Sequence, residues 1–118
     1  RLYYSAKASP GEREAGLSDQ PAAVREIFAK SNPAGRVRAN SHPTVKPIAL
    51  MRHLTRLLVP PGGTVLDPFT GSGSTGIASV LEGRPFLGIE RQAEYTTIAR
   101  ARLAHWRAIA AEQGSCRG

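Results

Sequence analysis

A glycine-rich turn with a carboxylate on each side is the part of this sequence best suited to chemistry. Gly71, Gly73 and Gly76 are spaced G-x-G-x-x-G, and Asp67 precedes them at the end of an apolar run. Glu90 ends the next apolar run, 19 residues after Gly71. An acid at that place accepts hydrogen bonds from a ribose diol, and glycines leave space for a ligand near the backbone. The pattern fits a dinucleotide and an adenosyl ligand equally.

Asp67 separates these two ligands. In the dinucleotide fingerprint the first glycine follows the strand directly, and the helix N-terminus meets a pyrophosphate. Here Asp-Pro-Phe-Thr (67–70) intervenes, and a carboxylate aimed into the pocket repels a diphosphate. S-adenosylmethionine, which carries a ribose, an ammonium and a sulfonium, is not repelled. The alternative role for Asp67 is a cap on the following helix. A P-loop is excluded because no lysine follows the glycines.

The surrounding periodicity predicts the elements that position these residues. Apolar residues recur at three- and four-residue steps in three segments, which predicts helices over 47–59, 74–83 and 92–114. The short apolar runs 64–69 and 85–90 predict strands buried on both faces. The order helix, strand, helix, strand, helix over 47–112 indicates a parallel β-α-β unit, so the predicted fold class is α/β.

The first 46 residues carry weaker signals. An aromatic run over 2–7 predicts a short strand, 9–16 reads as turn and polar residues, and 21–30 can form two helical turns. Closely spaced Pro, Gly, Asn and Ser predict a loop over 31–46.

Composition and charge limit the class of protein. The 118 residues fit one domain or part of one, and no run approaches the ~20 apolar residues of a membrane span. A single cysteine, Cys116, excludes an internal disulfide framework and favours a reducing cytoplasm. The net charge is +7, and no acid lies between Ile27 and Leu66. That stretch contains Lys30, Arg36, Arg38, Lys46, Arg52 and Arg56. It is either a footprint for a polyanion such as nucleic acid or a solvated loop.

Several motifs together resemble one enzyme family. They are YYSAKASPGEREAGL (3–17), HPTVKP (42–47), PPGGTVLDPFTGSGSTGIA (60–78) and GRPFLGIE (83–90). They look like the C-terminal half of bacterial and phage DNA amino-methyltransferases, specific for adenine or cytosine, in which the cofactor half follows the catalytic half. The resemblance runs from Leu2 to about Arg102. It implies an incomplete Rossmann-like fold that binds S-adenosylmethionine and acts on double-stranded DNA.

The resemblance also assigns roles to residues. Asp67 and the glycine turn would hold the methionine end of the cofactor, with Phe69 lying against it. Glu90 would bind the ribose, and Ile89 and Arg91 would flank the adenine edge. The positions implied for cofactor binding are Thr44, Val45, Lys46, Asp67, Pro68, Phe69, Gly71, Ser72, Gly73, Thr75, Glu90 and Arg91. The stretch Thr44, Val45, Lys46 and Pro47 would close the methionine side of the site. Lys46 has a second interpretation as an ordinary surface lysine. Arg36 and Arg38 are predicted to contact DNA phosphates.

The catalytic signature of the family is missing from the chain. Members use an Asp/Asn/Ser-Pro-Pro-Tyr/Phe tetrad to receive the flipped base and its amino group. The nearest match, DPFT (67–70), lacks the second proline and runs into the glycine turn. We therefore expect an upstream segment to carry catalysis and this chain alone to be inactive. The alternatives are a non-catalytic adenosyl- or nucleotide-binding module with a partner chain, or a fragment of an RNA or protein methyltransferase, which HPTVKP disfavours.

Histidines do not indicate a metal site. His42 has no second ligand at a metal-binding spacing, and His53 and His105 lie among apolar residues of the helices predicted above. No metal is expected.

Overall fold

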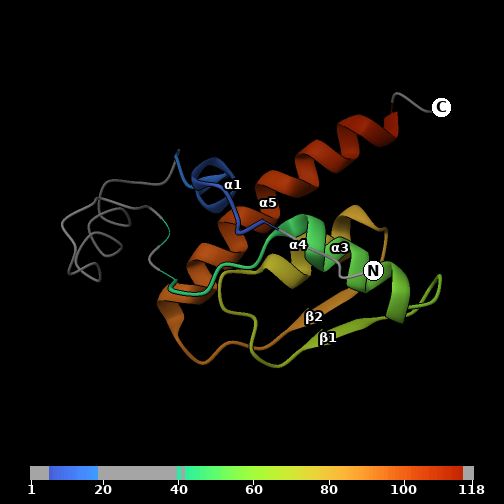
Figure 1. The fold of residues 1–118 in the computed structure, drawn as a ribbon, viewed down its shortest axis with the longest axis horizontal. Coiled ribbons are helices and arrows are strands. Elements are labelled where there is room, and N and C mark those ends of the chain that lie inside the picture. Colours follow the sequence, from blue (N-terminus) through green and yellow to red (C-terminus); the bar gives the residue numbers. More distant parts are fainter. Residues whose placement is uncertain (1–5, 19–39, 41, 116–118) are drawn as a thin grey trace.

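The computed structural model describes residues 6–18, 40 and 42–115 (Figure 1). Its elements in chain order are the helix α1 (Pro10–Glu14), the helix α3 (Ile48–Leu58), the strand β1 (Val65–Asp67), the helix α4 (Ser74–Leu81), the strand β2 (Phe86–Gly88) and the helix α5 (Ala93–Ser115). The predicted order of helix, strand, helix, strand, helix is confirmed. Helix α1 replaces the predicted turn. Ala6 and Lys7, the described end of the predicted strand 2–7, are coil, and segment 21–30 lies outside the described residues.

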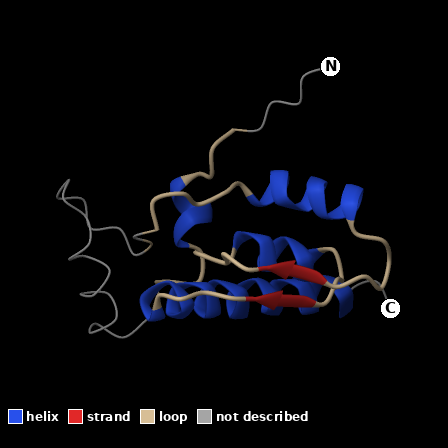
Figure 2. Ribbon diagram, turned by 90° about the horizontal axis from the view of Figure 1, so that it is seen from below, coloured by secondary structure: helices blue, strands red, loops and turns tan. Residues whose placement is uncertain are grey.

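The two strands are parallel and α4 is their crossover. Val65 pairs with Phe86, Leu66 with Leu87 and Asp67 with Gly88. Helix α4 contacts both strands and lies between α3 and α5. Figures 1 and 2 place these helices on one side of the strand pair.

The opposite face of the strand pair is open in the described part of the chain. Leu66 and Leu87, which are neighbours in the register, are 60% and 58% exposed. The prediction that both strands are buried on both faces is therefore wrong. The apolar runs do form strands, but within the described residues helices cover only one face of the strand pair.

Local sequence explains where α1 and α3 begin. The hydroxyl of Ser9 accepts a hydrogen bond from Glu12 N and caps α1, and Pro10 occupies its first position. Helix α3 follows Pro47, and the side chain of Glu12 accepts from the backbone N of Ile48 at its first turn. A carboxylate there is also favoured by the helix dipole. The short helix α1 thus holds the start of α3.

The core lies where α4 and α5 meet. Ile77, Ala78, Ile98 and Ala99 are buried there, and Leu17 packs on Ile98 from the segment after α1. No helix in the described part of the chain is long and apolar enough to cross a membrane.

Close packing joins α4 to β2 through one aromatic ring. A Cβ added at Gly76 would lie 2.6 Å from Cε1 of Phe86, and one at Gly88 would lie 2.8 Å from the same atom. The ring therefore occupies the space that two side chains would need.

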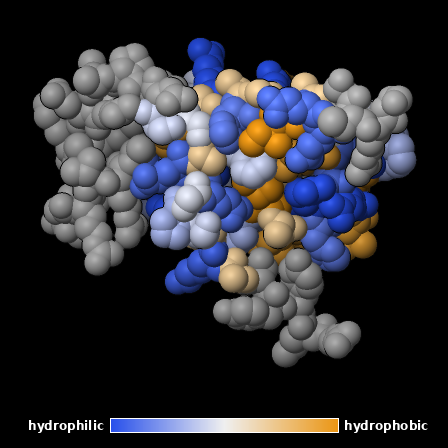
Figure 3. Space-filling model, turned by 90° about the horizontal axis from the view of Figure 1, so that it is seen from above, coloured by the Kyte–Doolittle hydropathy of each residue, from blue (hydrophilic) through white to orange (hydrophobic). Residues whose placement is uncertain are grey.

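The apolar residues of α3 are less buried than their regular spacing predicts. In α3 the fully buried residues are Ile48 and Thr55, whereas Leu57 and Leu58 are 69% and 72% exposed. Helix α3 lies at the outer edge of the helical layer and therefore covers little with its C-terminal turn. Figure 3, which views the side away from the strands, shows apolar surface between hydrophilic areas.

Candidate functional site

The glycine loop, residues 67–73, leaves β1 as a tight hydrogen-bonded turn. Asp67 Oδ1 accepts from Phe69 N at 3.0 Å, and the Thr70 hydroxyl donates to the Asp67 carbonyl at 3.1 Å. Gly71 and Gly73 have φ values of +54° and +79°, which favour glycine. Helix α4 begins after Gly73, with no side-chain cap bond. The alternative role of Asp67 as a helix cap is therefore wrong, because its carboxylate closes the turn instead.

Glu90 fastens the glycine loop to the end of β2. Its Oε2 accepts from Gly71 N at 2.8 Å, and its Oε1 accepts from Gln92 N at 2.9 Å. Hydrogen bonds from the backbone, first that of Gln92, lower the pKa of Glu90, so the carboxylate is ionised at neutral pH. The backbones are joined as well, since Ile89 N donates to Asp67 O and Thr70 N donates to Ile89 O. The structure thus brings the two predicted acids to adjacent strand ends.

Other residues of the protein fill the space beside the loop glycines. A Cβ at Gly71 would lie 2.5 Å from Nε2 of His42, and a Cβ at Gly73 would lie 3.1 Å from Cβ of Ala99. The space beside Gly76 is filled by Phe86, as described above. The chain's own side chains fill the Cβ positions of these glycines, and ligand binding by their backbone stays a prediction.

A buried arginine supports the loop from behind. Arg102 of α5 is 0% exposed, and its Nη1 donates to the Ser72 carbonyl at 2.7 Å and to Ser74 Oγ at 3.4 Å. Its Nη2 donates to the Glu12 carbonyl of α1 at 3.2 Å. Burial lowers the pKa of Arg102 to about 10, so it stays charged at neutral pH. No motif in the sequence singles out this residue, although it follows buried Ile98 by four positions and so shares its helix face.

A histidine that sequence analysis left without a role packs on the loop. The His42 ring lies against Gly71 and makes an edge contact with Tyr95, with centroids 4.6 Å apart. Its Nδ1 accepts from Thr44 N at 3.2 Å. Burial, partly opposed by the charge of Glu90, lowers the pKa of His42. The neutral ring therefore connects HPTVKP to the glycine loop.

The predicted methionine-side segment has one inward and two outward residues. Val45 is buried, whereas Thr44 and Lys46 are exposed. All three line a hollow of about 560 Å³ whose other wall is formed by residues 7–14. Glu90 and Thr70 line a different hollow of about 340 Å³ between β2 and α5. The two groups of predicted site residues thus line different hollows, and His42 contacts both Thr44 and the glycine loop.

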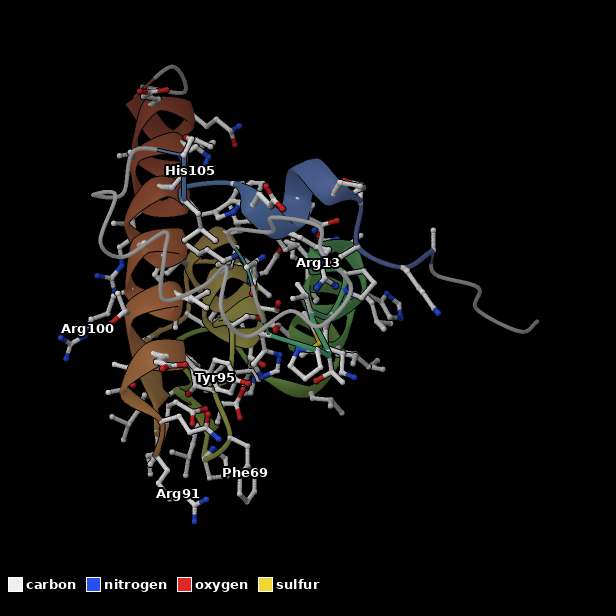
Figure 4. The ribbon with its side chains drawn as sticks, turned by 90° about the vertical axis from the view of Figure 1, so that its left-hand side faces the viewer. Arg13, Phe69, Arg91, Tyr95, Arg100 and His105 are labelled. Atoms are coloured by element: carbon white, nitrogen blue, oxygen red, sulfur yellow. The ribbon has the colours of Figure 1, made fainter. Side chains whose placement is uncertain are left out.

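The remaining predicted residues lie on the surface or outside the described residues. Phe69 is 87% exposed, and Figure 4 shows Phe69 and Arg91 projecting from the same end of the molecule. Pro68 is exposed and Thr75 is half-buried, whereas Ser72 is 3% exposed. Arg36 and Arg38 lie outside the described residues. Among the described residues there is no group of three His, Cys, Asp or Glu that could hold a metal.

A strand end carrying Asp-Pro-Phe, a glycine loop and an acid at the next strand end invite comparison with known proteins. Residues 3–101 match the DNA methylase family of N6 and N4 methyltransferases. The chain belongs to this DNA methylase family. This confirms the family that the motifs resembled.

Curated relatives agree with this membership. Over 65 residues the chain is 45% identical to the type II methyltransferase M2.DpnII of Streptococcus pneumoniae, covering 55% of this chain and 24% of that protein. Over 63 residues it is 44% identical to the DNA adenine methyltransferase YhdJ of Escherichia coli, covering 53% of this chain and 21% of that protein. The chain thus spans about a quarter of the length of these relatives.

Two solved structures share the fold. The M1.HpyAVI complex with S-adenosylmethionine matches with a TM-score of 0.53 and 45% identity, over 54% of this chain and 31% of the other. TTHA0409 from Thermus thermophilus is described as a putative DNA modification methylase in complex with S-adenosyl-L-methionine. It matches with a TM-score of 0.51 and 28% identity, over 91% of this chain and 40% of the other. The chain has part of the α/β fold of S-adenosylmethionine-dependent methylases.

Proposed function

We propose that this chain is the S-adenosylmethionine-binding part of a DNA methyltransferase that modifies the exocyclic amino group of adenine or cytosine at a specific site. The observation that carries the proposal is the placement of Asp67 and Glu90 at adjacent parallel strand ends, with the glycine loop bonded between them. Membership of the DNA methylase family supports it, as do two fold neighbours that are complexes with S-adenosylmethionine.

The chemistry of the residues fits this cofactor. Each oxygen of Glu90 accepts one backbone bond, and carboxylate oxygens can accept more than one, so ribose hydroxyls can still bind. The Asp67 carboxylate is half-buried and can receive the cationic methionine end, whereas it repels a diphosphate. Lys46, exposed beside the site, suits the methionine carboxylate, and the exposed ring of Phe69 can lie against the ligand. When bound, the cofactor supplies an electrophilic methyl group.

The chain's own residues bind and orient but do not receive the base. The segment DPFT cannot serve as the base-binding tetrad, because Asp67 O accepts from Ile89 N and Asp67 Oδ1 accepts from Phe69 N within the cofactor turn. Cofactor binding alone does not position an attacking amine. We therefore propose that a segment upstream of these residues provides the tetrad, and that this chain alone transfers no methyl group.

The DNA partner is proposed on the basis of family and charge. Arg36 and Arg38 remain predicted phosphate contacts in the acid-free stretch. Each lost phosphate contact lowers the salt slope of log K by about 0.9, whatever the base sequence. Arg36→Ala and Arg38→Ala test this in a protein that binds DNA, and an unchanged slope contradicts it. Because the proposed substrate is DNA and the relatives are bacterial, the proposed place of action is the cytoplasm.

Calorimetric titration tests the cofactor assignment. We expect the chain to bind S-adenosylmethionine and not NAD. Asp67→Asn and Glu90→Gln should each weaken binding about tenfold, because each replaces a hydrogen bond to a charged carboxylate by a weaker one to a neutral amide. Glu112→Gln, an exposed acid on α5, is the matched control and should change nothing. Unchanged affinity in both site variants, or preference for NAD, overturns the assignment.

A methyl-transfer assay tests whether catalysis needs a segment outside this chain. Purified chain incubated with labelled cofactor and mixed-sequence DNA should show no turnover. Turnover that survives repurification and disappears in Asp67→Asn would show that the tetrad is dispensable.

A further inference from the structure

His42 is held in place by its backbone. Its N–H donates to Asn40 Oδ1 at 3.1 Å, and its carbonyl accepts from Arg13 Nη2 at 3.0 Å. Asn40 is 1% exposed and donates through Nδ2 to the Arg13 carbonyl at 2.8 Å. Both backbone groups of His42 are therefore fixed against the end of α1, so its ring has a defined position.

The ring bridges two segments that are far apart in sequence. One nitrogen, Nδ1, accepts from Thr44 N, at the start of the methionine-side segment. The other, Nε2, faces Gly71, where a Cβ would lie 2.5 Å away. Tyr95 of α5 supports the ring from a third direction. Because Gly71 N is also the donor to Glu90, any shift of the ring acts on the contact that orients the ribose-side carboxylate.

Burial is the main cause that favours the neutral His42 ring and lowers its pKa below the ordinary value. Among the charged groups nearby, Glu90 favours a proton on the ring, whereas Arg13, Arg102 and Lys46 oppose it. A neutral ring keeps the lone pair that Thr44 N needs, whereas an imidazolium presents a donor at both nitrogens.

We propose that His42 is a positioning residue that couples the Thr44–Lys46 segment to the glycine loop, so that the two sides of the cofactor site are set together. The inference rests on the proposed function for the identity of the cofactor, but the coupling itself is a property of the free chain. Protonation of His42 at Nδ1 breaks the Thr44 bond, so the ring is no longer held on that side and can shift against Gly71. Cofactor affinity should therefore fall as the pH falls through the His42 pKa.

Two substitutions separate the ring's packing from its hydrogen bond. His42→Phe keeps a ring against Gly71 but has no acceptor for Thr44 N. His42→Asn keeps an acceptor near the place of Nδ1 but does not titrate. His53→Asn makes the same change at an exposed position of α3 and is the matched control.

The first measurement uses no ligand. In amide NMR spectra of the labelled chain between pH 7.5 and 5, we expect the Thr44 and Gly71 signals to shift together with the His42 imidazole. In His42→Asn neither should follow that transition, whereas in His53→Asn both should. A Gly71 amide that ignores His42 ionisation in the wild-type chain overturns the coupling.

The second measurement is S-adenosylmethionine affinity. His42→Phe should bind about threefold to tenfold more weakly at pH 7.5, as expected for one lost hydrogen bond. His42→Asn should recover part of that loss and show a flat pH profile. Wild-type affinity in His42→Phe overturns the inference. Failure of the wild-type chain to bind the cofactor counts against the proposed function instead, and the NMR measurement still decides the coupling.

Discussion

Replacing Arg102 tests the role of its buried guanidinium. The substitution loses hydrogen bonds, which lowers stability, but it also removes a buried charge, which raises stability. Replacing the arginine with methionine keeps an unbranched side chain in the same space but removes the charge and all donors. The Ser72 and Glu12 carbonyls, now bonded to the guanidinium at 2.7 and 3.2 Å, lose that donor. The glycine loop and α1 then have no shared anchor on α5.

The magnitude follows from these two effects. The buried Ser72 acceptor costs about 1–3 kcal/mol when it loses its donor, and the part-buried Glu12 acceptor costs at most as much, so the loss is at most about 6 kcal/mol. Removing a buried charge returns part of this. Burial lowers the pKa of Arg102 from 12.5 to about 10, which corresponds to roughly 3 kcal/mol at about 1.4 per pKa unit. Its Nε also has no hydrogen-bond partner within the described residues. We therefore expect Arg102→Met to lower the free energy of unfolding by at most about 3 kcal/mol.

Arg102→Met should affect the local stability of the glycine loop more than the global stability of the fold. Thermal unfolding followed by circular dichroism should shift by less than about 12 °C, at roughly 4 °C per kcal/mol for a chain of this size. Hydrogen exchange at the Gly71 and Gly73 amides should accelerate at least tenfold. Arg107→Met, at an exposed position of the same helix, should change neither. Complete unfolding of Arg102→Met would refute the estimate of the burial cost. Unchanged exchange at both glycines would refute the anchoring role.

Three further outcomes follow from the packing and the charges. Glu82→Gln should cost less than about 1 kcal/mol at pH 7, because the carboxylate bonds Arg56 and Arg52 but both arginines are exposed to solvent. These bonds lower the Glu82 pKa to about 2, so their contribution is present above 4.5 and lost as the pH falls toward 2. Denaturation at pH 7 and pH 3 should therefore show a flatter acid dependence in the variant, and parallel curves would contradict this. Gly73→Ala should cost about 1–3 kcal/mol in urea unfolding, because φ is +79° and Ala99 lies 3.1 Å from the new Cβ. A wild-type midpoint would exclude that strain. Leu87→Lys should change stability by less than about 0.5 kcal/mol and reduce self-association in light scattering, since Leu87 is 58% exposed. Loss of folding would show that this face is not open.

Sequence alone could predict the order of the elements and the meeting of the two acids. Periods of three and four residues identified α3, α4 and α5, and short apolar runs identified β1 and β2. Parallel strands end at the same edge, so Asp67 and Glu90 had to approach one another once a β-α-β unit was assumed. These inferences needed patterns of neighbouring residues alone.

Long-range contacts could not be read in the same way. Ser9 and Glu12 have the spacing of a capping box, but Pro10 and Gly11 made the segment look like a turn. The side chain of Glu12 also accepts a hydrogen bond from the backbone N of Ile48, which is 36 residues away, and local spacing cannot indicate such a contact. Arg102 and His42 act through carbonyls and a glycine that only the fold brings close. The sequence also predicted burial of Leu66, which is exposed. Hydropathy indicates that a side chain can be buried, but it does not show whether another element covers it.

The ring of Phe86 links the residues that evolution can accept at positions 76 and 86. A side chain at position 76 would stand 2.6 Å from Cε1 of that ring. A descendant that acquires alanine at 76 must therefore shrink residue 86 to keep α4 against β2. Glycine at 88 is required for a second reason, because Thr70 Oγ1 lies even closer than the ring to the place of an added Cβ. Across related sequences, positions 76 and 86 should therefore vary together, whereas 88 should stay glycine unless residue 70 also changes.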